Sequence, residues 1–198
     1  MLLVLASTSA YRRELLARLR LRFEVFAPGV DEVRLPDELP EAAARRLAQT
    51  KARAGVAIYP DALLIGSDQV AEIDGQRLDK PGTFERAAQQ LALLSGQCAD
   101  FHTAVALLNS RSGTLQTRVV VTRVYFRRFT ARQIETYLRK EQPFDCAGSA
   151  RSEGLGIALI ERIEGTDPTA LIGLPLMALT EMLQAEGVDV IERAAALQ

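Results

Sequence analysis

The sequence lacks the features on which several large protein classes depend. Its only cysteines, Cys98 and Cys146, lie far apart and form no CxxC pair, so neither a zinc site nor a disulfide framework is indicated. The net charge is −1, so no overall basic field draws the chain to nucleic acid or anionic lipid. No apolar run approaches the roughly 20 residues that a membrane-spanning helix needs. The apolar residues 1–6 are too few for a signal-peptide core. We therefore expect a cytoplasmic protein without a nucleic-acid or membrane partner.

Common signatures of nucleotide and hydrolase sites are absent too. No P-loop occurs, and the glycines Gly148, Gly154 and Gly156 do not follow the G-x-G-x-x-G spacing. His102 is the only histidine, and nothing in the sequence identifies serine or cysteine partners for a triad. We expect His102 to be a structural residue on a strand. A phosphate site would have to come from a local group of Lys, Arg and helix-capping residues.

The length and the hydrophobic pattern predict an α/β protein. A chain of 198 residues, 48% hydrophobic and 25% charged, can bury a core in one domain or in two small lobes around a cleft. Apolar runs predict strands over 2–6, 23–27, 62–73, 101–108 and 115–129, a strand and turn over 143–149, and a strand over 154–163. Helical spacing predicts helices from residue 10 and over 41–58, 84–94, 131–140 and 175–186, with Thr83 and Thr130 as caps of the third and fourth. This alternation, with one hairpin whose turn is at 109–113, indicates a mixed sheet flanked by helices.

The first candidate site lies at the start of the chain. The predicted strand 2–6 leads through the hydroxyl residues 7–9 into a predicted helix. Such residues are typical N-caps, and a helix N-terminus offers free N–H groups and a positive dipole end to a phosphate. Arg12 and Arg13 in the first turn oppose that dipole, and a bound anion would offset the penalty. A capped helix with two solvated arginines is the alternative.

Two acidic positions are candidates for metal or proton chemistry. Asp31-Glu32 lies in a predicted loop over 30–40, where a carboxylate is either solvated or a ligand for a hard divalent cation. Asp68 lies on a strand that otherwise reads as buried, and a buried carboxylate is costly unless it is paired or bound to a metal. Gly66 beside it lets another group approach the backbone closely. An aspartate near a metal can orient or deprotonate an attacking water, so we favour a functional role for Asp68.

Two lysines and one glutamate complete the candidates. Lys51 stands on a predicted helix, where a single lysine is normally solvated. Lys80 precedes a proline and follows the predicted tight turn at Asp74-Gly75, and its ammonium could neutralise a phosphate as a point charge. Glu153 lies between a serine and a glycine, where it could read the edge of a base or be a surface charge.

Together these segments resemble the Maf family of nucleotide pyrophosphatases, also described as septum-formation inhibitor-like proteins. Single matches would be weak, but their order and spacing are highly specific. The resemblance covers nearly the whole chain, so we expect residues 1–198 to form a single Maf-type domain. The matching segments are Leu5-Ala6-Ser7-Thr8-Ser9, Arg12-Arg13-Glu14-Leu15-Leu16, Val30-Asp31-Glu32, Leu47-Ala48-Gln49-Thr50-Lys51-Ala52, Ile65-Gly66-Ser67-Asp68-Gln69-Val70, Asp79-Lys80-Pro81, Leu94-Ser95-Gly96, Ala147-Gly148-Ser149 and Ile172-Gly173-Leu174-Pro175.

The resemblance implies an elongated α/β fold of the Maf/ITPase-like type, with a mixed sheet flanked by helices and two lobes around a central cleft. It implies hydrolysis of a nucleoside triphosphate to the monophosphate and pyrophosphate with a divalent cation such as Mg, Mn or Co. Members of the family often form dimers, so a homodimer is a further expectation. Carried over residue by residue, Asp68 is the proton acceptor, Glu32 and Asp68 are metal ligands, and the residues around the phosphates are Ser7, Arg12, Arg13, Lys51 and Lys80.

Three positions that the resemblance links to base choice are Tyr11, Gln69 and Glu153. Members that act on dTTP or UTP carry residues like Arg, Thr and Gln at these positions. The three residues in this chain look like those of the branch that acts on 7-methyl-GTP. A methylated guanine is cationic, so an aromatic face attracts it. The guanine edge carries N–H donors, which Glu153 would accept, and a pyrimidine would leave that carboxylate poorly paired. The resemblance therefore predicts a house-cleaning enzyme that removes 7-methyl-GTP.

Two other functions stay open from the sequence. One is a pyrophosphatase for dTTP, UTP or another modified base, which a panel of nucleotides would separate from the first. The other is a non-catalytic cell-division regulator that binds nucleotide as a sensor. A net charge near zero, without a basic stripe interleaved with aromatics, argues against binding of a polynucleotide.

Overall fold

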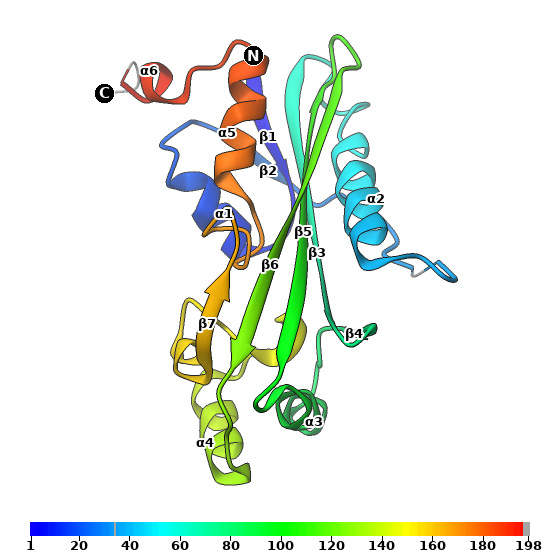
Figure 1. Ribbon diagram of the computed structural model, residues 1–198. Helices are drawn as coiled ribbons and strands as arrows, with labels where there is room; N and C mark the ends of the chain where they lie inside the picture. The colour runs from blue at the N-terminus through cyan, green and yellow to red at the C-terminus, as the bar shows by residue number, and fades with distance from the viewer. Residues whose placement is uncertain (34, 196–198) are drawn as a thin grey trace. The chain divides into compact units, whose positions relative to one another are not determined.

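The computed structural model describes residues 1–33 and 35–195 (Figure 1). The chain divides into two compact units. Among the described residues, the first unit holds 1–33, 35–68, 103–120 and 167–195, and the second holds 69–102 and 121–166. Within the described residues, seven strands form one mixed sheet in the order β2-β1-β3-β5-β6-β7, with β4 paired to β3. The predicted α/β class with a mixed sheet is confirmed.

The first unit builds on the parallel strand β1 (Leu2–Ala6), which pairs with β2 (Glu24–Phe26) on one side and β3 (Ala62–Ile73) on the other. Parts of β5 (Cys98–Asn109) and β6 (Leu115–Phe126) continue the sheet through the predicted hairpin at 109–113. The helices of this unit are α1 (Ala10–Ala17), α2 (Pro40–Arg53), α5 (Leu176–Ala185) and α6 (Val190–Ala195).

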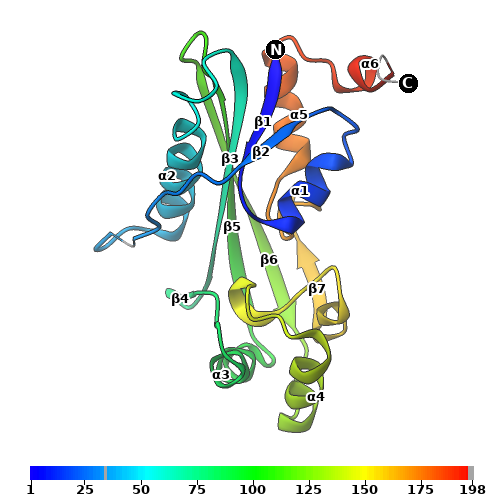
Figure 2. The ribbon, with the colours of Figure 1, turned by 180° about the vertical axis from the view of Figure 1, so that it is seen from behind.

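Helices cover both faces of the sheet in the first unit (Figures 1 and 2). Helices α1 and α5 lie on one face and α2 lies on the opposite face. Strand alternation explains this arrangement, because Leu3, Leu5 and Ile65 point to one side and pack in a cluster with leucines of α1 and α5. The other face meets the small, alanine-rich side of α2, whose buried residues include Ala44 and Ala48.

Gly66 sets how closely α2 approaches β3. A Cβ atom at this position would lie 2.0 Å from the backbone oxygen of Ala48 and 2.6 Å from the backbone nitrogen of Ala52. No side chain fits there, because both obstacles are main-chain atoms of a helix. The close approach expected beside Asp68 is confirmed, and the approaching group is the backbone of α2.

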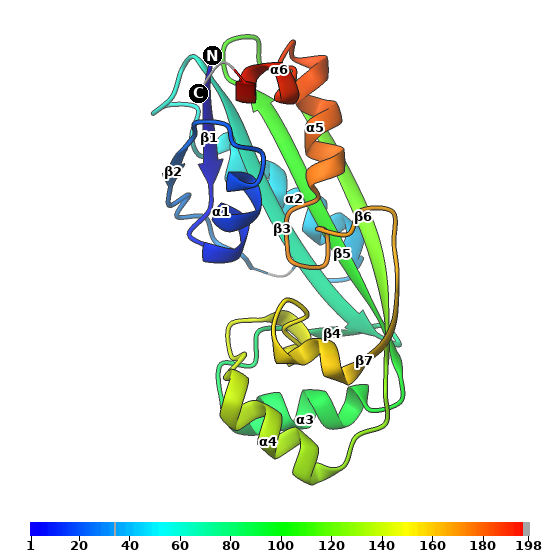
Figure 3. The same ribbon diagram turned by 90° about the vertical axis from the view of Figure 1, so that its left-hand side faces the viewer.

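The second unit contains β4 (Gln76–Leu78), β7 (Ile160–Glu164), α3 (Phe84–Leu94) and α4 (Ala131–Glu141), with the short 3-10 helices η1 (Ala147–Ser149) and η2 (Leu155–Leu159). The predicted turn at Asp74-Gly75 is confirmed, since both residues have positive φ, 49° and 77°, and β4 returns antiparallel to β3. The predicted caps Thr83 and Thr130 accept hydrogen bonds from the first turns of α3 and α4. Figure 3 shows these two helices side by side.

Several predicted boundaries are wrong. No strand forms over 143–149, because Gly148 and Ser149 adopt positive φ, which an extended strand excludes. The predicted strand over 154–163 begins only at Ile160, after η2. Helix α2 begins at Pro40 and ends at Arg53, because the chain passes through turns around Gly55, the poorest helix former after proline.

A sixth helix, α6, follows the predicted C-terminal helix among the described residues. The side chain of Asp189 accepts hydrogen bonds from the backbone nitrogens of Ile191 and Glu192, so the cap that starts α6 was present in the sequence and was overlooked. Arg34 of the predicted 30–40 loop and residues 196–198 lie outside the described residues. Across 1–33 and 35–195, no helix has the length and apolar character needed to cross a membrane.

We expect Gly66→Ala to lower the free energy of unfolding by about 3 kcal/mol, because the new methyl group would push α2 away from β3. Gly113→Ala is the matched control: its Cβ would meet no atom within 4 Å, although φ is 76°. Backbone strain alone should cost that variant about 1 kcal/mol. Urea unfolding of both variants measures the difference, and equal losses would contradict the role given to the close approach.

Candidate functional site

Three charged residues meet in the first unit. The Nζ atom of Lys51 on α2 lies 2.6 Å from Oδ1 of Asp68 on β3 and 2.6 Å from Oε1 of Glu32, in the loop after β2. Lys51 and Asp68 are both 5% exposed, whereas the side chain of Glu32 is 52% exposed. We call Glu32, Lys51 and Asp68 the carboxylate–lysine group. A single lysine on a helix is normally solvated, but Lys51 is buried and contacts two carboxylates.

The local fold explains why this group forms. Gly66 admits the backbone of α2 against β3, and Lys51 lies one turn after Ala48 on the helix face that approaches. Strand alternation puts Asp68 on the same face of β3 as Gly66. A buried carboxylate needs a partner, and the contact with Lys51 supplies a charge-assisted hydrogen bond of 2.6 Å.

The turn between β1 and α1 is built as the sequence predicts. Ser9 is the N-cap, and its Oγ accepts a hydrogen bond from the backbone nitrogen of Arg12 at 3.4 Å. Ser7 is buried, and its Oγ accepts a hydrogen bond from the backbone nitrogen of Ser9 at 3.1 Å. The hydroxyl-rich segment thus shapes the entry into the helix, and the first turn of α1 contains no acidic residue that would satisfy the dipole.

The two arginines of α1 have different surroundings. Arg13 is exposed, while Arg12 is partly buried and donates a hydrogen bond from Nε to the backbone oxygen of Gly173 at 2.9 Å. Burial lowers the pKa of the Arg12 guanidinium, and the nearby charges of Asp68 and Glu32 oppose that shift. Arg12 therefore lies within electrostatic range of the carboxylate–lysine group, and the four side chains carry two positive and two negative charges.

The loop before α5 holds Arg12 in place. The backbone oxygen of Gly173 also accepts a hydrogen bond from Oγ of Ser67 at 2.8 Å, and the same hydroxyl lies 2.7 Å from the backbone oxygen of Ala104. Ser67 is fully buried between Gly66 and Asp68 on β3. Its role was missed, because the sequence pattern does not tell which carbonyl a buried serine reaches.

Asp167 is a second residue that sequence reasoning missed. It is 3% exposed, and its Oδ2 accepts hydrogen bonds from the backbone nitrogens of Met177 and Ala178 at the start of α5. Its Oδ1 accepts two more, from the backbone nitrogen and the hydroxyl of Thr169. This carboxylate therefore caps α5 and shapes the loop that presents the Gly173 carbonyl. An Asp-Pro-Thr run shortly before a predicted helix was the available signal.

The remaining predicted site residues fall into two sets. Tyr11, on α1, is partly buried in the first unit. Gln69, Lys80 and Glu153 belong to the second unit, where Lys80 is exposed in the loop between β4 and α3. Oε1 of Glu153 accepts a hydrogen bond from Nε of Arg151 at 3.3 Å. Within one unit, the structure thus brings together Arg12, Glu32, Lys51 and Asp68.

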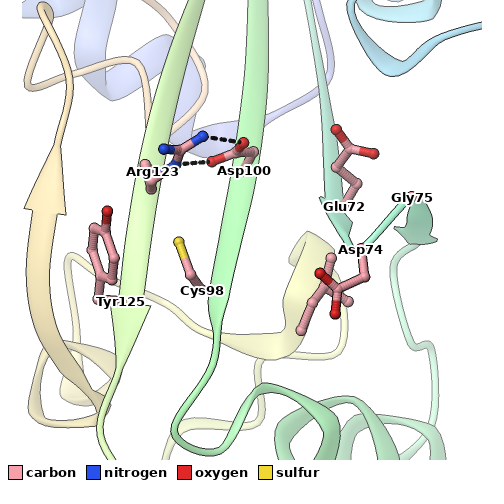
Figure 4. Close-up of a pocket in the computed structure, with 8 residues that line it drawn as sticks. Glu72, Asp74, Gly75, Cys98, Asp100, Arg123 and Tyr125 are labelled. Atoms are coloured by element: carbon pink, nitrogen blue, oxygen red, sulfur yellow. Dashed lines mark hydrogen bonds and ion pairs between the residues drawn. The ribbon is translucent and has the colours of Figure 1, made fainter.

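A cavity of about 460 Å³ lies in the second unit on β3, β5 and β6, and Figure 4 shows the residues around it. Arg123 donates two hydrogen bonds to Asp100, at 2.8 and 3.0 Å, which holds the pKa of that carboxyl below its usual range. Burial raises the pKa of the Cys98 thiol, which keeps it protonated. None of the predicted site residues lines this cavity, so we assign it no part in the site.

His102 is a strand residue, as expected. Its Nε2 lies 3.1 Å from Oε1 of Glu72. Among the described residues, no three His, Cys, Asp or Glu side chains converge on a point that could hold a metal ion by themselves. A cation at the carboxylate–lysine group would therefore have two protein carboxylates as ligands and would need further oxygens from another source.

The architecture and this charge-balanced group define an α/β protein with a buried polar site beside a capped helix start. A family model described as "Maf-like protein" matches residues 2–186. The chain belongs to the Maf family.

Three similar proteins carry the name 7-methyl-GTP pyrophosphatase. The protein from Thiobacillus denitrificans is 64% identical over 189 residues, which cover 96% of this chain and 94% of that protein. The one from Polaromonas sp. is 58% identical, covering 94% of this chain and 85% of its own length. The one from Nitrosococcus oceani is 56% identical, covering 96% and 95%.

We expect Asp167→Ala to lower the free energy of unfolding by about 3 kcal/mol, because it leaves buried donors at the start of α5 without their charged acceptor. Asp189→Ala is the control, since the exposed Asp189 caps α6 in a similar way. Its loss should be about 1 kcal/mol. Urea unfolding compares the two variants, and a loss for Asp167→Ala no larger than for the control would be inconsistent with a buried anchor.

Proposed function

We propose that this chain hydrolyses 7-methyl-GTP to 7-methyl-GMP and pyrophosphate with the help of a divalent cation. The names of the three relatives support the reaction and the substrate. The observation that carries the proposal is the carboxylate–lysine group with Arg12 beside it. Glu32 and Asp68 are candidate metal ligands, and Lys51 and Arg12 are cations that could bind phosphate oxygens. The buried Asp68 is also the candidate proton acceptor.

The residues present fit a hard divalent cation. Glu32 and Asp68 both contact the same ammonium, so they are candidate ligands for one ion. Magnesium is commonly bound by one or two carboxylates together with substrate phosphates, which matches a site with two carboxylates. When bound, such a cation would polarise a phosphoryl oxygen and neutralise charge on the leaving pyrophosphate.

The roles of the chain's own residues follow from their charges and positions. Water attacks the α-phosphorus, a new P–O bond forms, and the bond to the pyrophosphate oxygen breaks. Asp68 accepts the proton that the water loses. Lys51 and Arg12 place positive charge against the triphosphate, where negative charge develops in the transition state. Ser7 and the N–H groups at the start of α1 add donors without a charge.

The base would be selected by Tyr11, Gln69 and Glu153. The Tyr11 ring would stack on the cationic methylated base, and Glu153 would accept its N–H donors. This proposal includes the elongated two-lobed arrangement and central cleft that the family resemblance implies, with Lys80 adding positive charge to the phosphates. A cytoplasmic location, a homodimer and a single domain over residues 1–198 remain predictions.

We expect the purified protein with Mg²⁺ or Mn²⁺ to release pyrophosphate, and no inorganic phosphate, from 7-methyl-GTP. Its kcat/KM for this nucleotide should exceed that for GTP, UTP and dTTP by about 10-fold or more. Asp68→Asn, purified in parallel, controls for contaminating enzymes and should lose about 100-fold or more in kcat. Equal turnover of all four nucleotides would refute the base assignment, and near-normal activity of Asp68→Asn would refute the proton-acceptor role.

We expect the two arginines of α1 to differ in importance. Arg12→Gln should lower kcat/KM for 7-methyl-GTP by about 100-fold, because it removes a charge held beside the carboxylate–lysine group. Arg13→Gln should lower it by a smaller factor, because the exposed Arg13 would have to be ordered on binding whereas Arg12 is already held by Gly173. Steady-state kinetics of the two variants decides this, and a larger loss for Arg13→Gln would reverse the assignment.

A further inference from the structure

The loop that carries Glu153 is held by the C-terminal end of helix α4. Oε2 of Glu141, the last residue of α4, accepts a hydrogen bond from the backbone nitrogen of Leu155 at 2.8 Å. Its Oε1 lies 3.2 Å from Nη1 of Arg151. The Glu141 side chain is 14% exposed, whereas that of Arg151 is 36% exposed. One carboxylate thus binds both ends of the segment 151–155.

Arg151 passes this constraint on to Glu153. Nη1 of Arg151 contacts Glu141, and Nε of the same guanidinium donates a hydrogen bond to Oε1 of Glu153 at 3.3 Å. The backbone nitrogen of Arg151 donates to the hydroxyl of Tyr137, also on α4, at 3.0 Å. Burial raises the pKa of Tyr137 to about 12, so this phenol stays neutral at physiological pH. The guanidinium therefore bridges two carboxylates while its own backbone is fixed.

Gly154 shows that the loop is fitted around Glu141. A Cβ atom at Gly154 would lie 2.4 Å from Oε1 of Glu141 and 2.9 Å from its Cδ. Any side chain at this position would displace the carboxylate. The glycine beside Glu153 thus permits the contact that orders the loop.

The contact with Arg151 leaves Glu153 able to bind a ligand. An ionised carboxylate offers about four lone-pair sites, and the hydrogen bonds from Arg151 and Ser152 use one on each oxygen. A free glutamate would have to lose side-chain rotamers on binding a base, which costs free energy. A carboxylate already held in one orientation avoids much of that cost.

We propose that Glu141 is a positioning residue for base recognition, which acts through Arg151 to hold Glu153 in one orientation. This inference rests on the proposed role of Glu153 in binding the guanine edge. It adds a determinant of specificity that lies on α4 and touches no substrate itself. Substitution of Glu141 should therefore weaken the binding of a nucleotide that contacts Glu153. It should leave the binding of a nucleotide that does not contact Glu153 unchanged.

The test is steady-state kinetics of Glu141→Gln with 7-methyl-GTP and UTP. We expect KM for 7-methyl-GTP to rise by about 10-fold with kcat changed less than about 3-fold, because one charged contact is lost outside the reacting atoms. The kinetic constants for UTP should stay the same. Glu135→Gln is the matched control, since Glu135 lies on the same helix and forms its salt bridge with the exposed Arg139. It should change neither nucleotide.

A double-mutant cycle separates positioning from a general structural role. In the Glu153→Gln background, Glu141→Gln should cause no further loss, because it acts through the residue already changed. Gly154→Ala, which displaces the Glu141 carboxylate but keeps its charge, should reproduce the rise in KM. Thermal unfolding of each variant checks that the fold persists.

The outcomes distinguish this inference from the function on which it rests. If Glu153→Gln weakens 7-methyl-GTP but Glu141→Gln and Gly154→Ala do not, the inference is wrong and the proposed role of Glu153 survives. Equal losses for both nucleotides, or losses that multiply in the double variant, also overturn it. If Glu153→Gln itself leaves the preference for 7-methyl-GTP unchanged, the proposed base recognition fails, and the inference fails with it.

Discussion

The buried ion pair between Lys51 and Asp68 is the interaction around which the first unit is arranged. Neither charge could stay buried alone, because each would lose its hydration without replacement. Each therefore requires α2 to lie close to β3, and Gly66 permits that approach by having no side chain. The exposed Glu32 adds a second carboxylate to the same ammonium. The ion pair that burial requires therefore also brings together the charged groups that the proposed chemistry uses.

Three consecutive residues of β3, Gly66, Ser67 and Asp68, make contacts on both faces of the sheet. Gly66 and Asp68 belong to the face that meets α2, while Ser67 points to the opposite side and reaches the carbonyls of Ala104 and Gly173. The Gly173 carbonyl also receives Arg12. The alternation of one strand therefore links helix α2, helix α1 and the loop before α5. A change at Ser67 or in that loop would reach the position of Arg12 without touching it.

Local signals in the sequence predicted most elements and several caps. Ser9, Thr83 and Thr130 cap the helices expected to follow them, and Asp74-Gly75 makes the expected turn, because each acts through neighbours within four residues. The predictions failed where glycines were read as parts of strands. Around Gly148 and Gly154 the chain forms 3-10 turns, since apolar content alone does not separate a buried strand from a buried turn.

The sequence by itself determined which chemical groups are available and that they belong to a Maf-type chain. It identified Asp68 as a carboxylate that needs a partner and Glu32, Lys51 and Arg12 as candidates, because residue type and local pattern carry that information. Only the tertiary structure decided that Lys51 is that partner, and that Arg12 and Arg13 have different surroundings. These facts depend on contacts between residues far apart in the chain, such as Arg12 with Gly173, and on burial, which no local pattern specifies.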